Sequence, residues 1–433
     1  MRTERWVRIV GIALGVLSWF SVNAFADVSP GDVIDKSNWE KAEGLLPESV
    51  LNWVKKGDFI LTIGKLNYDP YDFVPEAIIR NWETNKGKYA LDETDNIVDA
   101  LTGQQPDFVE GWPFPGVDMN DPKAAYKIMY NRVFYGHNLG ATDTPFNGVW
   151  VGRGGYEREV KAAYLGHPMH GFPGTRGLEN PQQMEKYSII RIMSPVDISG
   201  TNVLTWRFLG DKEDMTYSYV PAIRRVRRMS PANRSDAFIG TDMCVDDSFG
   251  FDGKITSVDW KIIGIRETLG PFLSEDPQQI VQNEKGEWVS TSTIKPIVYG
   301  WEKERWTGAP WAPTNLLWVK RKLIGLEITP RDPYYNYGIQ QLWLDARFQF
   351  TATYKIINDR AGNYWKTVLL CTSGFQSADQ KMRFMQAPMY LAVDDRIDHA
   401  TIVRTISPQA VCRWFCVQNL NMYSISGFQK LCK

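Results

Sequence analysis

Histidine and cysteine are scarce in this chain. Its 433 residues include only four histidines and five cysteines. The sequence patterns of serine hydrolases, zinc peptidases, P-loop proteins and dinucleotide-binding proteins are also missing. We therefore predict no catalytic residue, no metal and no cofactor. The formal net charge of -1 argues against nucleic acid as a partner, because nucleic-acid binding needs a broad basic surface.

Two groups of potential metal ligands fall short of a metal site. His167 and His170 lie in a segment rich in proline and glycine, and no third ligand is nearby. The second group consists of four acidic residues, Asp242, Asp246, Asp247 and Asp252. It lacks the spacing of an EF-hand loop, so we predict a solvated loop there. Since five cysteines are an odd number, at least one thiol stays unpaired in an oxidising compartment.

The first 26 residues have the parts of a secretory signal peptide. Arginines precede an apolar run over 9–20, and Ala24-Phe25-Ala26 is a cleavage site that gives a mature chain from Asp27. An uncleaved anchor is the alternative, but the apolar run is short for a membrane span of about 20 residues. No later segment is long and apolar enough to span a bilayer, so we expect a periplasmic protein of a Gram-negative cell.

Alternation of apolar and polar residues dominates the chain from Tyr187 onward. It predicts strands over 187–193, 203–209, 215–220, 256–263, 316–328, 342–357 and 364–372, after two strands within 148–161. Short turns between such strands indicate an antiparallel meander. The long helices that a parallel sheet needs between its strands are missing. The predicted fold is therefore mainly β with some α.

Besides a helical segment over 76–82, two helices are predicted in the first third of the chain. Residues 46–56 have apolar positions at helical spacing and end at Gly57. A second helix continues to Tyr135, with Asp121 as its N-cap and the stem of Arg132 on its apolar face. This second helix either closes over the sheet or packs on it permanently.

The densest positive charge follows a predicted hairpin. Pro221 ends the second strand, because proline has no N–H to donate. The next residues include four arginines, Arg224, Arg225, Arg227 and Arg228. Guanidinium groups match phosphate and carboxylate geometry, so the cluster is a candidate site for an anionic head group or an acidic partner. The alternative is pairing with nearby acids, namely Asp211, Asp214, Asp236 or Asp242.

Three segments resemble a known family. They are YVPAIRRVRRMSPANRSDAFIGTD (219–242), GWPFPGVDMNDPKAAYKIMYN (111–131) and ITPRDPYYNYGIQQLWLD (328–345). They are similar to LolA-like periplasmic proteins, and within these to the domain of unknown function 1329 family, described as outer-membrane lipoprotein-sorting-like. The resemblance extends from about Asp58 to about Arg404.

This resemblance implies a strongly curved antiparallel sheet, a half-barrel like that of LolA and LolB, with covering helices and long loops. Its concave face would hold acyl chains. We expect a signal peptide over 1–26, a single LolA-like domain over 27–410 with an N-terminal helical and loop extension, and a segment of unclear role over 411–433. The candidate ligand-binding residues are Tyr219, Trp206, Phe208, Arg225 and Arg228.

The function we expect is a periplasmic carrier for a lipid or another hydrophobic ligand. It would work with an inner-membrane transporter and an outer-membrane acceptor, in outer-membrane biogenesis or lipid export. Burying an acyl chain gains about 0.8 kcal/mol per methylene, so a chain crossing water favours a sheltered groove. One alternative is an envelope hydrolase acting on a lipid or glycan, with His137 or His399 beside a carboxylate and a serine. The other is a non-catalytic assembly partner that binds protein through a sheet edge or the arginine cluster.

Overall fold

The computed structural model describes residues 28–230, 234–347 and 351–432, so the predicted signal peptide lies outside the described residues. The helices are α1 (Glu48–Lys56), α2 (Glu76–Arg80), α3 (Trp82–Asn85), α4 (Ala124–His137) and α5 (Ile425–Leu431). The strands are β1 (Val33–Ile34), β2 (Leu61–Ile63), β3 (Tyr89–Leu91), β4 (Ile97–Asp99), β5 (Thr142–Gly152), β6 (Gly155–Pro168), β7 (Met184–Ser194), β8 (Asn202–Phe208), β9 (Met215–Val220), β10 (Arg225–Arg228), β11 (Val258–Phe272), β12 (Gln278–Gln282), β13 (Trp288–Ser290), β14 (Leu317–Pro330), β15 (Tyr337–Asp345), β16 (Ala352–Asp359), β17 (Tyr364–Ser377), β18 (Arg383–Asp394), β19 (His399–Arg404) and β20 (Arg413–Trp414).

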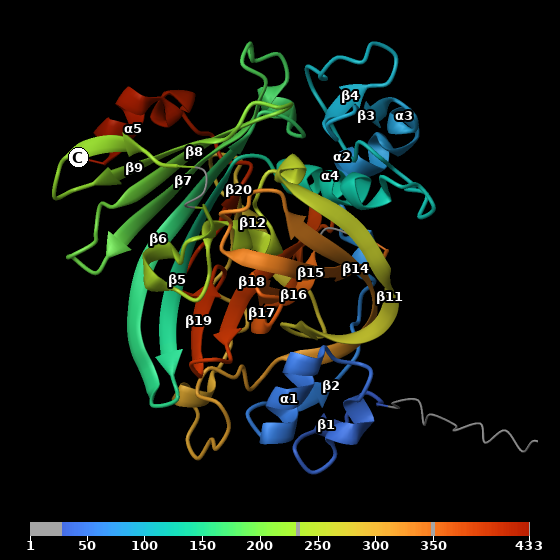
Figure 1. Ribbon diagram of the computed structural model, residues 1–433, viewed down its shortest axis with the longest axis vertical. Coiled ribbons are helices and arrows are strands. Elements are labelled where there is room, and N and C mark those ends of the chain that lie inside the picture. Colours follow the sequence, from blue (N-terminus) through green and yellow to red (C-terminus); the bar gives the residue numbers. More distant parts are fainter. Residues whose placement is uncertain (1–27, 231–233, 348–350, 433) are drawn as a thin grey trace, which may run out of the picture.

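Most of these strands form one strongly curved antiparallel sheet (Figure 1). Its neighbours run in the order β10, β9, β8, β7, β6, β5, β19, β18, β17, β16, β15, β14 and β11. The short strands β12, β13 and β20 link β17 to β5, and β3 pairs with β4 in a separate hairpin. The predicted mainly β fold with a curved antiparallel sheet is confirmed.

The turns explain where the predicted boundaries hold and where they were wrong. Val220 ends β9 directly before Pro221, as predicted. The single strand predicted over 342–357 is instead two strands, β15 and β16. The Asp345 side chain accepts a hydrogen bond from the Arg347 N–H at 3.0 Å, which is the local bond that starts a turn. The prediction also missed β10, because a strand made mostly of arginine has no apolar alternation.

The helix prediction was right in place and wrong in one detail. Helix α1 ends at Gly57, which adopts the left-handed conformation with φ of 80°. Helix α4 begins at Ala124 with Lys123 as its N-cap, so Asp121 is not the N-cap. The Asp121 carboxylate instead accepts from the Lys123 N–H at 2.8 Å, just before the helix.

Both faces of the central sheet are buried. On β17, Val368 and Leu370 belong to a core that includes α4, whereas Leu369 and Cys371 belong to a core that includes α1. Such strands are apolar on both faces, which strict alternation underestimates. Helix α4 carries fully buried side chains such as Phe134, so it packs on the sheet and is not an exposed flap.

The C-terminal segment is joined to the main sheet. Strand β20 pairs with both β13 and β5, and Phe428 of α5 packs in a small core with Leu204 and Tyr219. The domain boundary at residue 410 stays a prediction. All five cysteines are free thiols. Within the described ranges, no helix has the length and apolar character needed to cross a membrane.

Residues 237–252, which we call the inner loop, cross the concave face of the sheet. Four acidic residues attach this loop to other parts of the chain. Asp242 lies 2.7 Å from His399 Nδ1, Asp246 lies 2.5 Å from Arg234, and Asp247 lies 2.6 Å from Lys355. The fourth, Asp252, lies 2.5 Å from Lys186. The prediction of a solvated acidic loop was wrong, because all four carboxylates pair with cationic or imidazole groups.

The pair between Asp247 and Lys355 is the most deeply buried of the four. Both side chains have an exposed fraction of 0%. The same carboxylate accepts from Tyr337 Oη at 2.7 Å and from the Cys244 N–H at 2.8 Å. Removing one member of such a pair leaves an uncompensated charge in the core.

We predict that Asp247→Ala lowers the free energy of unfolding by about 3–5 kcal/mol, measured by urea denaturation. Burial raises the pKa of the Asp247 carboxyl, but Lys355 and Lys366 outweigh burial and hold the pKa below its usual range. The stabilisation is therefore present above the unfolded-state pKa of about 4 and is lost as the pH falls through the folded-state pKa. Asp197→Ala, at an exposed site, is the control and should change stability by less than about 0.5 kcal/mol. A loss below about 1 kcal/mol for Asp247→Ala contradicts the assignment.

Candidate ligand cavity

Two adjoining cavities lie between α4, the inner loop and the concave face of the sheet. The first has a volume of about 150 Å³ and the second about 90 Å³. They share four lining residues, Thr144, Tyr164, Phe249 and Tyr390. The concave face is therefore filled largely by the chain itself. Instead of one sheltered groove, the structure has a pair of small, partly open cavities.

Phe249 of the inner loop stands between the two cavities. Its ring lies 5.5 Å from the ring of Tyr164 and 6.1 Å from that of Tyr390, both in edge-on contacts. Its backbone has φ of 56°, a left-handed conformation that is uncommon for a bulky residue. Ile239, which lines the second cavity, has φ of 46°. The inner loop thus holds two strained residues with their side chains at the cavity walls.

The second cavity is apolar. Its walls include Phe146, Trp150, Val160, Ile190 and Val403 from the sheet. Phe238 and Ile239 close it from the inner loop. This composition fits hydrocarbon, which gains free energy from contact with such walls.

The first cavity has a polar end. Arg132 and His137 of α4 line it, together with Lys186 of β7 and its partner Asp252. Burial lowers the pKa of Arg132 to about 10, and burial holds the pKa of His137 well below its usual range. At neutral pH Arg132 is therefore charged and His137 is neutral. The expected uniformly apolar inner face is thus apolar at one end and polar at the other.

None of the predicted ligand-binding residues lines either cavity. Trp206 and Tyr219 pack on the C-terminal segment, where Trp206 Nε1 donates to the Tyr423 carbonyl at 2.8 Å. Phe208 is buried with Met169 and Met184. Arg225 and Arg228 lie on the edge strand β10. The role of the five predicted residues in ligand binding stays a prediction. The sequence did not indicate the cavity residues of α4 and the inner loop, except that it placed Arg132 on an apolar helix face.

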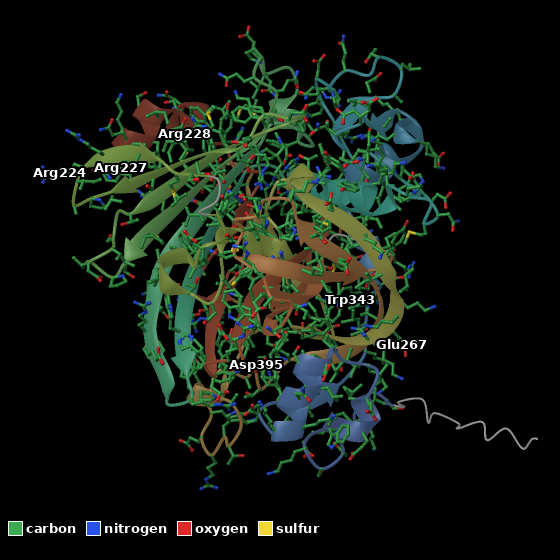
Figure 2. The ribbon with its side chains drawn as sticks, viewed as in Figure 1. Arg224, Arg227, Arg228, Glu267, Trp343 and Asp395 are labelled. Carbon is green, nitrogen blue, oxygen red and sulfur yellow. The ribbon has the colours of Figure 1, made fainter. Side chains whose placement is uncertain are left out.

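The arginine cluster lies at the free edge of the sheet. Figure 2 shows Arg224, Arg227 and Arg228 beside α5, away from the centre of the molecule. In the described chain, none of the four arginines forms an ion pair or a side-chain hydrogen bond. The pairing predicted for them was wrong, because the candidate acids bind other groups. Asp211 accepts from Asn96, Asp214 from Arg207, Asp236 from Asn336 and Asp242 from Thr401.

The two histidines considered for hydrolysis have carboxylate neighbours. His399 lies 2.7 Å from Asp242 and 3.3 Å from Glu157, and His137 Nε2 lies 3.6 Å from Glu185. No serine hydroxyl among the described residues hydrogen-bonds either imidazole. The same part of the chain contains no group of three histidine, cysteine or acidic side chains arranged to hold a metal ion.

A third cavity of about 640 Å³ lies on the opposite face of the sheet, beside α1. Lys55, Lys56 and Arg266 line it, together with Asp395, which Figure 2 labels near α1. Asp395 accepts from Trp53 Nε1 at 2.8 Å and from Tyr364 Oη at 2.5 Å. Most of the side chains that line this groove are polar or charged, so it fits an apolar ligand less well than the second inner cavity does.

The sequence matches a family model over residues 33–308, more than half of the chain. The model describes DUF1329, a family of proteins of unknown function. The chain belongs to this family. The predicted membership is thus confirmed, and no curated protein matches this DUF1329 protein.

Solved structures with a similar fold come from three bacteria. A putative outer membrane lipoprotein-sorting protein domain from Vibrio parahaemolyticus is 15% identical, with a TM-score of 0.43, and the match covers 67% of this chain and 92% of that one. A DUF1329 family protein from Desulfovibrio piger is 14% identical, with a TM-score of 0.42 and coverage of 68% and 98%. A LolA superfamily protein from Nitrosomonas europaea is 10% identical, with a TM-score of 0.39 and coverage of 69% and 97%.

We predict that Phe249→Ala joins the two cavities. Because the ring is only partly buried, the free energy of unfolding should fall by about 2 kcal/mol, less than for a fully buried phenylalanine. The neutral dye N-phenyl-1-naphthylamine should bind more tightly to the variant than to the unchanged protein, as measured by fluorescence titration. Phe172→Ala, at another partly buried phenylalanine that lines neither cavity, should leave dye binding unchanged. Equal dye affinity for Phe249→Ala and the unchanged protein contradicts the role of Phe249 as the dividing wall.

Proposed function

We propose that this protein is a periplasmic carrier that shelters the acyl chain of a lipid between α4, the inner loop and the sheet. The observation that supports the proposal best is the pair of adjoining cavities, one of them apolar, which share Phe249, Thr144, Tyr164 and Tyr390 as lining residues. Ligand pockets usually have volumes of roughly 300–1,000 Å³. Each cavity is smaller than this range, so ligand entry requires the inner loop to move.

The inner loop is the element suited to such movement. It is attached by side-chain ion pairs and is not a strand of the sheet. Strain at Ile239 and Phe249 lowers the free energy needed to displace it, because each left-handed bulky residue costs of order 1–3 kcal/mol. Helix α4 places six side chains in the buried core, whereas the inner loop places three there, Met243, Cys244 and Phe251, so the helix is the more firmly held wall. Loop movement therefore opens the cavities without unfolding the sheet.

The proposed location and partners follow from two features of the chain. The signal peptide predicted for residues 1–26 directs export to the periplasm. A carrier in that compartment receives its ligand from an inner-membrane transporter and delivers it to an outer-membrane acceptor. The unpaired arginines of the β10 edge are the proposed contact for one of these membrane partners, because exposed guanidinium groups favour an anionic surface.

We expect the mature chain, purified from its native cells without detergent, to carry lipid. Organic extraction followed by mass spectrometry should detect an acyl-containing compound in an amount comparable to that of the protein. The same protein, freed of lipid by denaturation and refolding, should bind a fluorescent fatty acid that unlabelled fatty acid displaces. A clean extract together with no displaceable binding would overturn the carrier function.

We predict that the double variant Arg225→Glu/Arg228→Glu loses binding to membranes isolated from the same cells. Reversing two charges should weaken co-sedimentation at least about tenfold at low salt, because each basic residue near an anionic surface contributes about 1 kcal/mol. High salt should weaken the co-sedimentation of the unchanged protein in the same way.

The matched control for this prediction is Lys285→Glu/Arg305→Glu, which reverses two exposed cations elsewhere. It should keep membrane binding, and both double variants should keep fatty-acid binding. Equal co-sedimentation of the two double variants contradicts a docking role for the β10 edge.

A further inference from the structure

Arg132 is a buried cation without an acidic partner. It lies on α4 with an exposed fraction of 7%, and it lines the first cavity. Its Nη1 donates to the Phe251 carbonyl at 3.1 Å, and its Nη2 donates to the Phe249 carbonyl. Its Nε has no hydrogen-bond partner among the described residues. No carboxylate of the described chain forms an ion pair with it, and the internal gaps 231–233 and 348–350 contain no acidic residue.

Arg207 and Lys355 are buried cations with acidic partners, whereas Lys366, also buried, donates to the Asp242 carbonyl at 2.6 Å and forms no ion pair among the described residues. Arg207 lies 2.8 Å from Asp214, Arg234 lies 2.5 Å from Asp246, and Lys355 lies 2.6 Å from Asp247. An uncompensated buried charge costs several kcal/mol, and two carbonyl acceptors offset only part of that cost. Arg132 thus has no carboxylate within ion-pair distance among the described residues and, unlike Lys366, it lines a cavity.

The groups around Arg132 can hold an anion. His137, on the same helix and cavity wall, is 5% exposed, and neither of its ring nitrogens makes a hydrogen bond. Its imidazole is neutral, so one of these nitrogens carries a proton that it can donate. Because Nε2 lies 3.6 Å from Glu185, Nδ1 is the nitrogen left to serve a ligand. Lys186 also lines the cavity, but Asp252 already balances its charge. The charged side chains that line this cavity are two cations, Arg132 and Lys186, and one acid, Asp252, so this end of the cavity matches a ligand group with a negative charge.

The apolar wall lies on the other side of the same space. Tyr164, Phe249 and Tyr390 border both cavities, and beyond them the second cavity is lined by aromatic and aliphatic side chains. An amphiphile with its head at Arg132 would place its chain past Phe249 toward Trp150. The same inner loop supplies the two carbonyls that hold Arg132 and the ring that divides the cavities.

We propose that the first cavity is a head-group site for an anionic amphiphile, in which Arg132 binds a carboxylate or phosphate and His137 donates a further hydrogen bond. This inference rests on the proposed function, because it assigns the polar end of the ligand whose acyl chain the carrier shelters. Arginine is suited to this task, since its planar fork of N–H donors matches both anions. The ligand class is therefore acidic lipids, and neutral or cationic amphiphiles are disfavoured.

The test compares amphiphiles that have the same hexadecyl chain length and different head groups. N-phenyl-1-naphthylamine, a neutral dye, is bound to the lipid-free mature protein and displaced by hexadecanoate, hexadecyl phosphate, hexadecanol or hexadecylamine. We expect the two anions to act at concentrations roughly tenfold or more below that of hexadecanol, as a charge-assisted hydrogen bond provides. The stronger of the two anions identifies the preferred head group. Hexadecylamine should be the weakest.

Variants separate a binding role from a structural one. Arg132→Met should remove the preference for anions while hexadecanol still displaces the dye, and Arg132→Lys should keep the preference in part. Arg360→Met, at an exposed arginine that lines none of the three cavities, is the matched control and should behave like the unchanged protein. If Arg132 serves only to tie α4 to the inner loop, its loss weakens all four ligands equally.

Two outcomes overturn the head-group site. One is equal displacement by all four head groups in the unchanged protein, a comparison that needs no variant. The other is an anion preference that persists in Arg132→Met. If none of the four amphiphiles displaces the dye, the result is different. It overturns the carrier function itself, and the head-group site with it.

Discussion

The buried ion pair between Asp247 and Lys355 is the constraint on which the arrangement of the cavities depends. It fixes the inner loop across the concave face at a point where both side chains are fully buried, and three further acids attach the same loop to other parts of the chain. Without these attachments a curved sheet of this size would expose its inner face to water. With them, the loop covers the face and leaves only the space around Phe249. The two cavities are therefore a consequence of how the loop is held, not of the sheet alone.

The same attachments give the interior one charged end and one apolar end. Arg132 of α4 lines the first cavity together with Lys186 of β7, which pairs with Asp252 of the loop, so this cavity has charged walls. The second cavity lies where the loop contributes Phe238 and Ile239 and the sheet contributes only apolar and small polar side chains. An interior with one charged and one apolar end favours amphiphiles, which also have one charged end and one apolar end. This polarity supports the proposed lipid ligand more specifically than the curvature of the sheet does.

The sequence predicted the parts of this structure that depend on local patterns. Alternation placed β7, β8 and β9, and Pro221 marked the end of β9. The acids of the inner loop were visible but misread, because the partner of Asp247 lies 108 residues away at Lys355. Arg132 was placed correctly on an apolar helix face, yet its acceptors are backbone carbonyls more than 100 residues later, which no side-chain pattern reveals. The ligand residues were sought in the hairpin of β8 and β9, where the aromatic side chains instead pack on the C-terminal segment.

The most direct test of an acyl-chain site inside the sheet is a crystal structure of the mature chain with hexadecanoate that carries bromine on its terminal carbon. Anomalous scattering locates the bromine without reference to any expected pose. The carrier function predicts a bromine position beside Trp150 and Val160, with the ring of Phe249 displaced and the two cavities joined. Bromine found only on the outer surface, for example in the groove beside α1, with Phe249 unmoved, would contradict it.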